Sequence, residues 1–425
     1  MSLTAVLEKL YARRRFGIRP GVDRVCTLLG RLGNPEKSFR TIHLVGTNGK
    51  GSTAAFLSTI LMLADHKVGQ FSSPHLVRFT ERFRINGTEY PAEKLATHLD
   101  TVLAAAPDDA TFFEITTALA AYMFHAERIE LAVMEAGMGG RSDATAALPG
   151  IATIITPISL DHTDYLGATL GEIATEKSGI IEPGTPVITA RQPDAVATVL
   201  SSYCREHGCQ LAGLDKEFSI QRGVDGSVAY RGIRASFTRL FPGIPGNYQA
   251  GNVAVALAAA EILETLGIAI PPAAFPAGIE RACWPGRMEL IEGTPPLLLD
   301  GAHNPAGAAA LAEGLQEYRR NRLLLVTGVC NDKDAAALYQ PLLPLADAIY
   351  TVTPAVERAL TDQKLTELFR TQGFASQPCG SVTAGIAAAR RTASADDLIL
   401  VCGSLFLVGE VKAWLEQADY TGIRG

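Results

Sequence analysis

The run Ile-His-Leu-Val-Gly-Thr-Asn-Gly-Lys-Gly-Ser-Thr at residues 42–53 constrains this chain more than any other segment. An apolar strand leads into a glycine-rich turn, and residues 54–64 continue with helical character. A strand, loop and helix in this order direct several backbone N–H groups and a helix N-terminus towards one point, which suits a polyphosphate. The segment therefore predicts a phosphate-binding loop at the start of a helix.

The composition of the loop agrees with this prediction. Its members are Gly46, Thr47, Asn48, Gly49, Lys50, Gly51, Ser52 and Thr53. The three glycines let the backbone curl close to phosphates where a Cβ would clash, Lys50 would bring positive charge to the β/γ oxygens, and a hydroxyl would face Mg²⁺. Gly51 separates the lysine from the first hydroxyl, so the spacing departs from G-x-x-x-x-G-K-[ST]. A plain glycine turn is the alternative, and the lysine and hydroxyls argue against it.

Bulk properties exclude several classes of protein. A chain of 425 residues needs two or three domains, and a net charge of −6 gives no footprint for nucleic acid or an anionic membrane. The N-terminal pattern of Leu3, Val6, Leu7 and Leu10 is amphipathic and lacks the apolar core of a signal peptide. Seven cysteines make no disulfide framework. We expect a reduced, cytoplasmic protein without a membrane span.

Short apolar runs without alternation indicate buried strands of parallel sheets. They cover residues 42–45, 131–135, 151–156, 186–190, 297–300, 323–327, 348–353 and 398–401. Helical stretches at 54–64, 116–128, 252–266, 306–319 and 362–372 lie between them, which predicts an α/β fold. Residues 210–245 contain short strand-like pieces and predict a small antiparallel layer. Proline and glycine concentrate at 285–296, so we expect a first domain of residues 1–286 and a second of 287–425.

Seven sequence blocks, in order, resemble one protein family. After Gly-Thr-Asn-Gly-Lys-Gly-Ser come residues 72–76 (SSPHL) with 78–82 (RFTER), 135–141 (EAGMGGR), 161–163 (DHT), 176–179 (EKSG), 285–287 (PGR) and 300–305 (DGAHNP). Together they resemble the folate branch of the Mur ligase superfamily, which comprises dihydrofolate synthase and folylpolyglutamate synthase. The resemblance implies a P-loop-type parallel-sheet ATPase domain followed by a smaller Rossmann-like α/β domain.

The implied activity is ATP-dependent addition of L-glutamate to folates, and to dihydropteroate as well. Such a ligase phosphorylates a carboxylate and lets an amine attack the acyl phosphate, so it needs a phosphate cradle, Mg²⁺ and positive charge. Glu135 ends an apolar strand in the crevice where α/β sheets bind ligands, and its oxygens suit Mg²⁺. By resemblance, Ser73 and His162 join Glu135 as metal ligands, and Lys177 is carbamylated and holds a second Mg²⁺. Alone, Lys177 reads as a surface charge and His162 as a turn or core histidine.

The resemblance also assigns residues to the substrates. Lys50, Lys177 and His303 would act in catalysis, and Asn252, Arg287 and Asp300 would bind ATP with the loop. Thr111, Phe113 and Asp143 would contact the pterin, and His303, Ser404 and Lys333 the glutamate. Helix capping by Asn252, turn chemistry at Asp300 and Asn304, and core packing of Phe113 are the alternatives. Tyr248 replaces a family histidine, and Ser142 and Ala146 depart from the pattern beside Asp143.

Competing functions remain open at this point. A folylpolyglutamate synthase without the dihydropteroate activity is the first alternative. A Mur-type peptidoglycan ligase is disfavoured by Gly51 and by the 73–75 block, a P-loop phosphotransferase would not need Arg287, Asp300 and His303, and a non-catalytic binding protein would be expected to have lost Lys50, Glu135 or His162. Expected ligands are ATP, two Mg²⁺, L-glutamate and a folate or dihydropteroate, with a monovalent cation as a further candidate. We expect a monomer that binds neither nucleic acid nor membrane.

Overall fold

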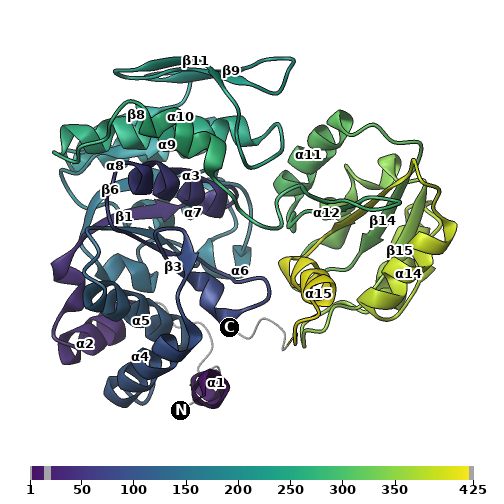
Figure 1. The fold of residues 1–425 in the computed structure, drawn as a ribbon, viewed down its shortest axis with the longest axis horizontal. Helices are drawn as coiled ribbons and strands as arrows, with labels where there is room; N and C mark the ends of the chain where they lie inside the picture. Colours follow the sequence, from purple (N-terminus) through teal and green to yellow (C-terminus); the bar gives the residue numbers. More distant parts are fainter. Residues whose placement is uncertain (1, 14–20, 421–425) are drawn as a thin grey trace.

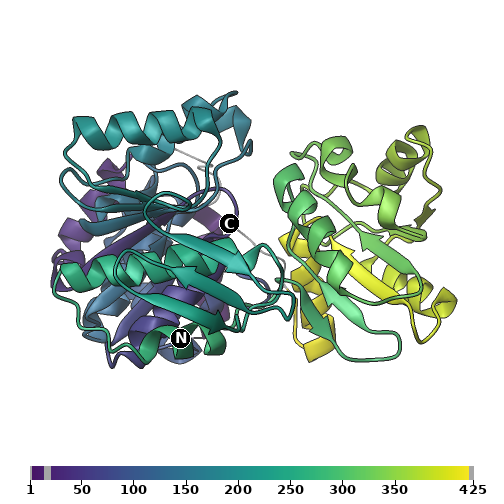
Figure 2. The same cartoon turned by 90° about the horizontal axis from the view of Figure 1, so that it is seen from above.

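The computed structural model describes residues 2–13 and 21–420 of the chain and contains two α/β bodies lying side by side (Figures 1 and 2). The first body is built on an eight-stranded sheet and the second on a six-stranded sheet. This agrees with the predicted α/β class. The boundary at residues 286/287 stays a prediction, although β12 (Glu289–Ile291) already pairs with β13 (Leu297–Leu299) in the second sheet.

The first sheet has the strand order β4-β3-β2-β5-β1-β6-β7-β8. Its strands are β1 (Arg40–Val45), β2 (Val68–Phe71), β3 (Phe83–Ile85), β4 (Thr88–Glu89), β5 (Leu131–Glu135), β6 (Gly150–Ile155), β7 (Val187–Thr189) and β8 (Leu211–Gly213). All pairs from β2 to β8 are parallel, whereas β3 and β4 form an antiparallel hairpin at one edge. The central strands are buried on both faces, which explains their unbroken apolar sequences.

Helices cover both faces of this sheet. On one face α3 (Lys50–Leu63), α9 (Gln249–Thr265) and α10 (Ala274–Arg281) share a core with β1, β5 and β6. On the other face lie α1 (Leu3–Tyr11), α2 (Asp23–Arg31), α4 (Ala92–Ala105) and α5 (Phe112–Ala126). The short helix α6 (Thr163–Leu166), with α7 (Leu170–Ser178) and α8 (Asp194–Glu206), packs near the β6–β7–β8 end.

A separate three-stranded antiparallel sheet lies over α9 and α10 (Figure 1). It consists of β9 (Ser219–Arg222), β10 (Val228–Arg231) and β11 (Ser236–Leu240). The fully buried Glu261 on α9 holds this layer, because its carboxylate accepts hydrogen bonds from Tyr230 Oη at 2.7 Å and from the backbone N–H of Ile233 and Arg234 at 3.0 Å. A charged group is tolerated there because several donors satisfy it.

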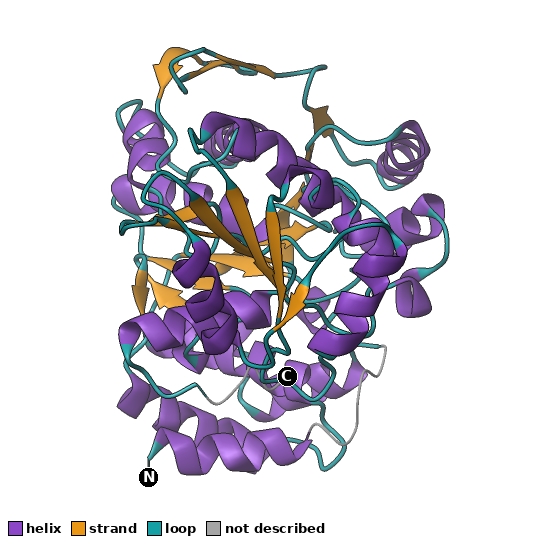
Figure 3. Ribbon diagram, turned by 90° about the vertical axis from the view of Figure 1, so that its right-hand side faces the viewer, coloured by secondary structure: helices purple, strands orange, loops and turns teal. Residues whose placement is uncertain are grey.

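The second sheet has the order β12-β13-β17-β14-β15-β16. Its remaining strands are β14 (Leu323–Thr327), β15 (Ala348–Thr351), β16 (Gln377–Pro378) and β17 (Leu398–Cys402), all parallel to β13. Helices α11 (Pro305–Gly314), α12 (Ala335–Tyr339) and α13 (Asp362–Thr371) cover one face, and α14 (Val382–Thr392) and α15 (Leu405–Glu416) the other (Figure 3). Leu76 and Val77 of the first body contribute to the α14–α15 core.

The predicted strands all occur, but several boundaries and one hairpin differ from the sequence prediction. Helix α3 starts at Lys50 instead of residue 54, α5 at Phe112 instead of 116, and α11 ends at Gly314 instead of 319. Strands β2, β3, β4, β12 and β16 were not predicted, because each is short and several carry polar residues such as Gln70 and Arg84. Across the described ranges, no helix is long and apolar enough to span a membrane.

Candidate active site

Three adjacent strands of the first sheet end at the candidate site. β1 leads into the phosphate loop, β5 ends at Glu135, and β6 leads into residues 156–162, and β1 lies between the other two. The loops after β1 and β6 are joined, since the backbone N–H groups of Thr47 and Asn48 donate to Pro157 O at 2.9 and 3.3 Å. Ligands bind at such carboxyl edges in open α/β sheets.

The phosphate loop has the backbone that the sequence predicts. Gly49 precedes α3 with φ 87°, and a Cβ there would collide with Oδ1 of Asn252. The side chain of Lys50 folds over the loop, and its Nζ donates to Gly46 O at 3.3 Å and to Thr47 O at 3.2 Å. The same Nζ lies 3.8 Å from Glu135 Oε1. A cation held above a ring of loop atoms is placed to meet phosphate oxygens.

The two hydroxyls that follow the lysine of the loop are not directed to open space. Ser52 is buried, and its Oγ accepts from Gln249 Nε2 at 3.3 Å, while Thr53 is fully buried within α3. Asn252 lies inside α9 and donates to Gln249 Oε1 at 2.7 Å, so the helix-capping interpretation of Asn252 is wrong. Its contact with Gly49 places it against the phosphate loop instead.

Trp284 explains the extra glycine of the loop, and the sequence analysis missed it. An added Cβ at Gly51 would lie 2.5 Å from Trp284 Nε1 and 2.8 Å from Cε2, so the indole covers the first turn of α3 directly. The guanidinium of Arg84 lies over the indole of Trp284, 5.4 Å from the ring centroid. A serine or threonine at position 51, as in the common P-loop spacing, would displace the tryptophan. The adjacent Pro285-Gly286-Arg287 block was the available signal.

The candidate metal ligands surround the loop. Glu135 is buried, and burial raises its pKa, while Lys50, Arg287 and the backbone of Ser73 oppose that rise. His162 is the N-cap of α6 with φ 51°, and desolvation lowers its pKa although the charge of Asp161 opposes this. Hydroxyl, carboxylate and imidazole groups fit a hard or borderline divalent cation. Throughout residues 2–13 and 21–420, no three His, Cys, Asp or Glu side chains meet at one point, so a metal here would need other donors such as Ser73 or phosphate oxygens.

Lys177 is not a surface charge. Its side chain is buried, and Nζ donates to Gly46 O of the phosphate loop at 3.0 Å. Burial, followed by the nearby charge of Lys50, lowers the pKa of Lys177 to about 7. The surface-charge interpretation of Lys177 is therefore wrong, and its amine is partly neutral near physiological pH.

The second body contributes the loops after three of its own adjacent strands. β13 leads into residues 300–304, β17 into Ser404, and β14 into the segment with Lys333, and β17 lies between the other two. Asp300 accepts hydrogen bonds from Ala302 N at 2.8 Å, Met288 N at 2.9 Å and Tyr248 Oη at 3.0 Å. Burial raises the pKa of Asp300, and Arg287 opposes that rise.

Tyr248 and Arg287 link this loop to the first body. Tyr248, at the N-terminus of α9, keeps a hydrogen-bond donor where the family has a histidine. Arg287 Nη1 donates to Gly286 O at 2.9 Å, and its guanidinium lies where a Cβ of Gly301 would be. Turn chemistry at Asp300 is therefore present together with contacts across the two bodies.

Two of the three candidate glutamate residues, His303 and Lys333, face the first body. His303 Nδ1 donates to Gly301 O at 2.8 Å, which leaves Nε2 unprotonated and 3.8 Å from Asp161 Oδ2. Burial is the main reason that the pKa of His303 falls to about 4. Lys333 Nζ forms an ion pair with Asp161 Oδ1 at 2.5 Å. Ser404 is the N-cap of α15, and its Oγ accepts from Phe406 N at 3.1 Å.

The candidate pterin residues also have structural tasks. Thr111 and Glu114 form a capping box at the start of α5, and the Phe113 ring lies against Gly137, 5.9 Å from the Phe71 ring. Asp143 is buried and accepts from Met138 N and Thr145 N at 2.9 Å and from Thr145 Oγ1 at 2.6 Å. Burial raises the pKa of Asp143, which these hydrogen bonds oppose. Asp143 thus shapes its own loop, whatever it binds.

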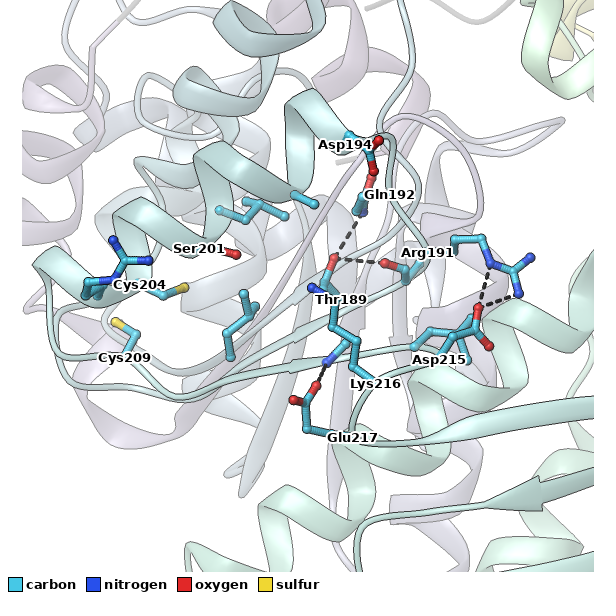
Figure 4. Close-up of a pocket in the computed structure, with 17 residues that line it drawn as sticks. Thr189, Arg191, Gln192, Asp194, Ser201, Cys204, Cys209, Asp215, Lys216 and Glu217 are labelled. Carbon is cyan, nitrogen blue, oxygen red and sulfur yellow. Dashed lines mark hydrogen bonds and ion pairs between the residues drawn. The ribbon is translucent and has the colours of Figure 1, made fainter.

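A further cavity of about 510 Å³ lies away from this site, between β7, β8 and α8 (Figure 4). Cys204 and Cys209 line it, and Gln192 Nε2 donates to Thr189 Oγ1 at 3.1 Å on its floor. The neighbouring His207 stacks on Tyr203 with the ring centroids 4.0 Å apart, and its Nδ1 donates to Tyr203 O at 2.9 Å. Two carboxylates of the cavity are engaged, Asp215 with Arg191 and Glu217 with the backbone N–H of Gly213. Among the described residues, no three His, Cys, Asp or Glu side chains meet here to hold a metal.

Comparison with known proteins gives the family of the chain. The description "Mur ligase middle domain" matches residues 44–260, and "Mur ligase, glutamate ligase domain" matches residues 286–405. The chain belongs to the Mur ligase family, in the branch of the dihydrofolate synthases and folylpolyglutamate synthases.

Individual relatives and structures support this membership. The dihydrofolate synthase/folylpolyglutamate synthase of Bacillus subtilis is 33% identical over 96% of this chain and 97% of its own. A probable bifunctional folylpolyglutamate synthase/dihydropteroate synthase of Halobacterium salinarum is 36% identical over 94% of this chain, which spans only 50% of that longer relative. E. coli FolC in complex with DHPP and ADP has a TM-score of 0.89 and 31% identity, with 97% of this chain and 98% of that one covered. A bifunctional enzyme with Mn, AMPPNP and L-glutamate bound has a TM-score of 0.88 and 30% identity, with 98% of both chains covered.

Proposed function

We propose that this protein is an ATP-dependent amide ligase that joins L-glutamate to folates and also to dihydropteroate. One observation carries the proposal: the loops of the first body with Lys50, Glu135 and Asp161 face a second set of loops with His303 and Lys333. The first set suits a nucleotide and the second suits an amino acid with two carboxylates. The relatives named for both activities, and the solved homologues bound to ADP, DHPP and glutamate, support it.

The proposed reaction has two steps. The substrate carboxylate attacks the γ-phosphoryl group of ATP, which gives an acyl phosphate and ADP. The amine of L-glutamate then attacks the acyl carbon and displaces phosphate, and the amine loses a proton. In this proposal Lys50 would stabilise charge on the phosphoryl group during the first step, and Arg287 and Asp300 would contact the nucleotide from the second body.

We further propose where divalent cations would bind. Ser73, Glu135 and His162 would hold one Mg²⁺, and a carbamylated Lys177 would provide the oxygen ligand for a second. When bound, these cations would neutralise negative charge on the phosphates. The proposed pterin contacts are Thr111, Phe113 and Asp143, and a monovalent cation stays a further candidate.

The test is a phosphate-release assay with purified protein, ATP, Mg²⁺ and L-glutamate. We expect release with both dihydropteroate and tetrahydrofolate, and none without the pteridine or without glutamate. Release with tetrahydrofolate alone would restrict the protein to folylpolyglutamate synthesis. Release with a UDP-muramoyl peptide alone would point to a peptidoglycan ligase, and release that is independent of glutamate to a phosphotransferase. We also propose that the protein is a cytoplasmic monomer, and gel filtration would test its oligomeric state.

A further inference from the structure

Asn304 uses its whole amide group to connect the two bodies. Its Oδ1 accepts from Asn48 Nδ2 at 3.0 Å, and its Nδ2 donates to Asn48 Oδ1 at 3.0 Å and to Asp161 Oδ2 at 3.2 Å. The same Oδ1 accepts from Gly307 N at 2.8 Å, which caps α11. The side chain is 3% exposed, so each of its donors and acceptors is matched inside the protein.

The partners of Asn304 belong to the catalytic side of the first body. Asn48 is a member of the phosphate loop, and its backbone N–H donates to Pro157 O at 3.3 Å. Asp161 ends the loop that begins at that proline, and it is also the anion that faces Lys333 and His303. Asn48, Asp161, His303, Asn304 and Lys333 thus form one polar cluster, which we call the interdomain seam.

The hydrogen bonds of Asn304 show that this residue does more than cap α11. Aspartate and serine cap helices about as well as asparagine, because a cap needs only an acceptor. The Nδ2 donor of Asn304 contributes nothing to α11, and both of its hydrogen bonds go to the first body. The reciprocal amide pair forms only when Asn48 and Asn304 meet face to face, so it specifies one placement of the two bodies.

We propose that Asn304 and Asp161 are positioning residues that hold the loops of His303 and Lys333 at a fixed place relative to the phosphate loop. The proposal rests on the proposed function, in which the second body presents glutamate to a carboxylate activated at the first. Reacting groups must lie within about 3–3.5 Å, and a misplacement of about 1 Å can cost on the order of 10²-fold in rate. A change in the seam should therefore lower the rate of the second, amide-forming step more than it lowers the affinity for the nucleotide.

The principal variant is Asn304→Asp, which keeps the size of the side chain and the cap but removes both donated hydrogen bonds and places a carboxylate against Asp161. We expect kcat to fall on the order of 10²-fold and the KM for glutamate to rise, with ADP affinity measured by calorimetry little changed. Asn304→Ser, a neutral cap without an amide, should lose less. Ser381→Asp, at the exposed N-cap of α14, is the matched control and should behave as wild type.

The double variant Asn304→Asp/Asp161→Asn provides the rescue. The donor and the carboxylate exchange places across the 3.2 Å contact, and the cluster keeps a single carboxylate at this contact, so we expect at least tenfold recovery of kcat over Asn304→Asp. A merely structural role would give two additive losses instead. Wild-type kcat and glutamate KM in both Asn304 variants, or no recovery in the double variant, would overturn the proposal.

Small-angle scattering with AMPPNP tests the seam without turnover. We expect a larger radius of gyration for Asn304→Asp than for wild type, and a return towards wild type in the double variant. An unchanged radius in every variant would overturn the proposal. If wild type forms no product from glutamate with either pteridine, the proposed function fails, while the scattering series still decides whether these residues place the two bodies.

Discussion

Replacing Lys177 with methionine should stabilise the metal-free protein near neutral pH, although it should abolish ligase activity. Burial and the charge of Lys50 lower the pKa of Lys177 from 10.5 to about 7 in the folded protein. At about 1.4 kcal/mol for each pKa unit, this gap means that the buried ammonium costs roughly 4 kcal/mol at pH 7. Methionine fills a similar volume without a charge.

The sign of the pH dependence follows from the direction of the shift. The folded-state pKa lies below the unfolded one, so between about pH 7 and pH 10.5 the unfolded chain binds one proton more than the native protein. The free energy of unfolding of wild type should therefore rise with pH in this window, by about 1.4 kcal/mol per unit. Below pH 7 the whole penalty is present.

The assay is urea unfolding of wild type and Lys177→Met in CO₂-free buffer with a chelator, at about pH 6, 7.5 and 9. The stability difference should favour the variant most at the lowest pH and shrink as the pH rises. Lys216→Met, at an exposed lysine, is the control and should show a small difference that does not depend on pH. A difference that is flat in pH, or a variant that is less stable at pH 6, would refute the reasoning.

The same neutral amine is what carbamylation requires, because only the unprotonated form reacts with CO₂. Wild type in ¹³C-bicarbonate should give a carbamate resonance that acid removes and that Lys177→Met lacks. Persistence of that resonance in the variant would assign it to another amine.

Three further substitutions test the site. Lys50→Ala should leave the fold intact and lower turnover on the order of 10³-fold, because a cation beside the phosphoryl group is lost; near-normal kcat at saturating ATP would contradict this. Gly51→Ala should weaken ATP binding, since its Cβ would lie 2.5 Å from Trp284 Nε1, and Trp284→Ala should partly restore it; two additive losses would argue against the clash. Asp143→Ala should leave the loop donors unpaired and cost about 1–3 kcal/mol in urea unfolding, with dihydropteroate use reduced more than ATP binding; unchanged unfolding would show that the three hydrogen bonds carry little.

The local sequence was sufficient to predict a structural feature where all the residues that form the feature lie in one segment. The loop at residues 46–53 specifies its own backbone, because glycine at position 49 permits a positive φ and the following residues form a helix. The buried strands were predictable because a strand covered on both faces must be apolar throughout. Hairpin β3–β4 was not predicted for the opposite reason: it lies at the edge of the sheet, where polar residues are tolerated.

What the residues contact was decided only by the tertiary structure. The sequence places Lys177 in an amphipathic helix that resembles any surface helix, and its burial and low pKa arise because α7 packs that lysine against Gly46, 131 positions away. Trp284 and Gly51 are ordinary residues until the linker crosses α3. Asn48 and Asn304 lie 256 positions apart, so no local pattern can reveal that their amides meet. The chain sequence thus specified the chemistry of each loop, whereas the packing of two sheets decided which loops face each other, because that depends on contacts summed over the whole fold.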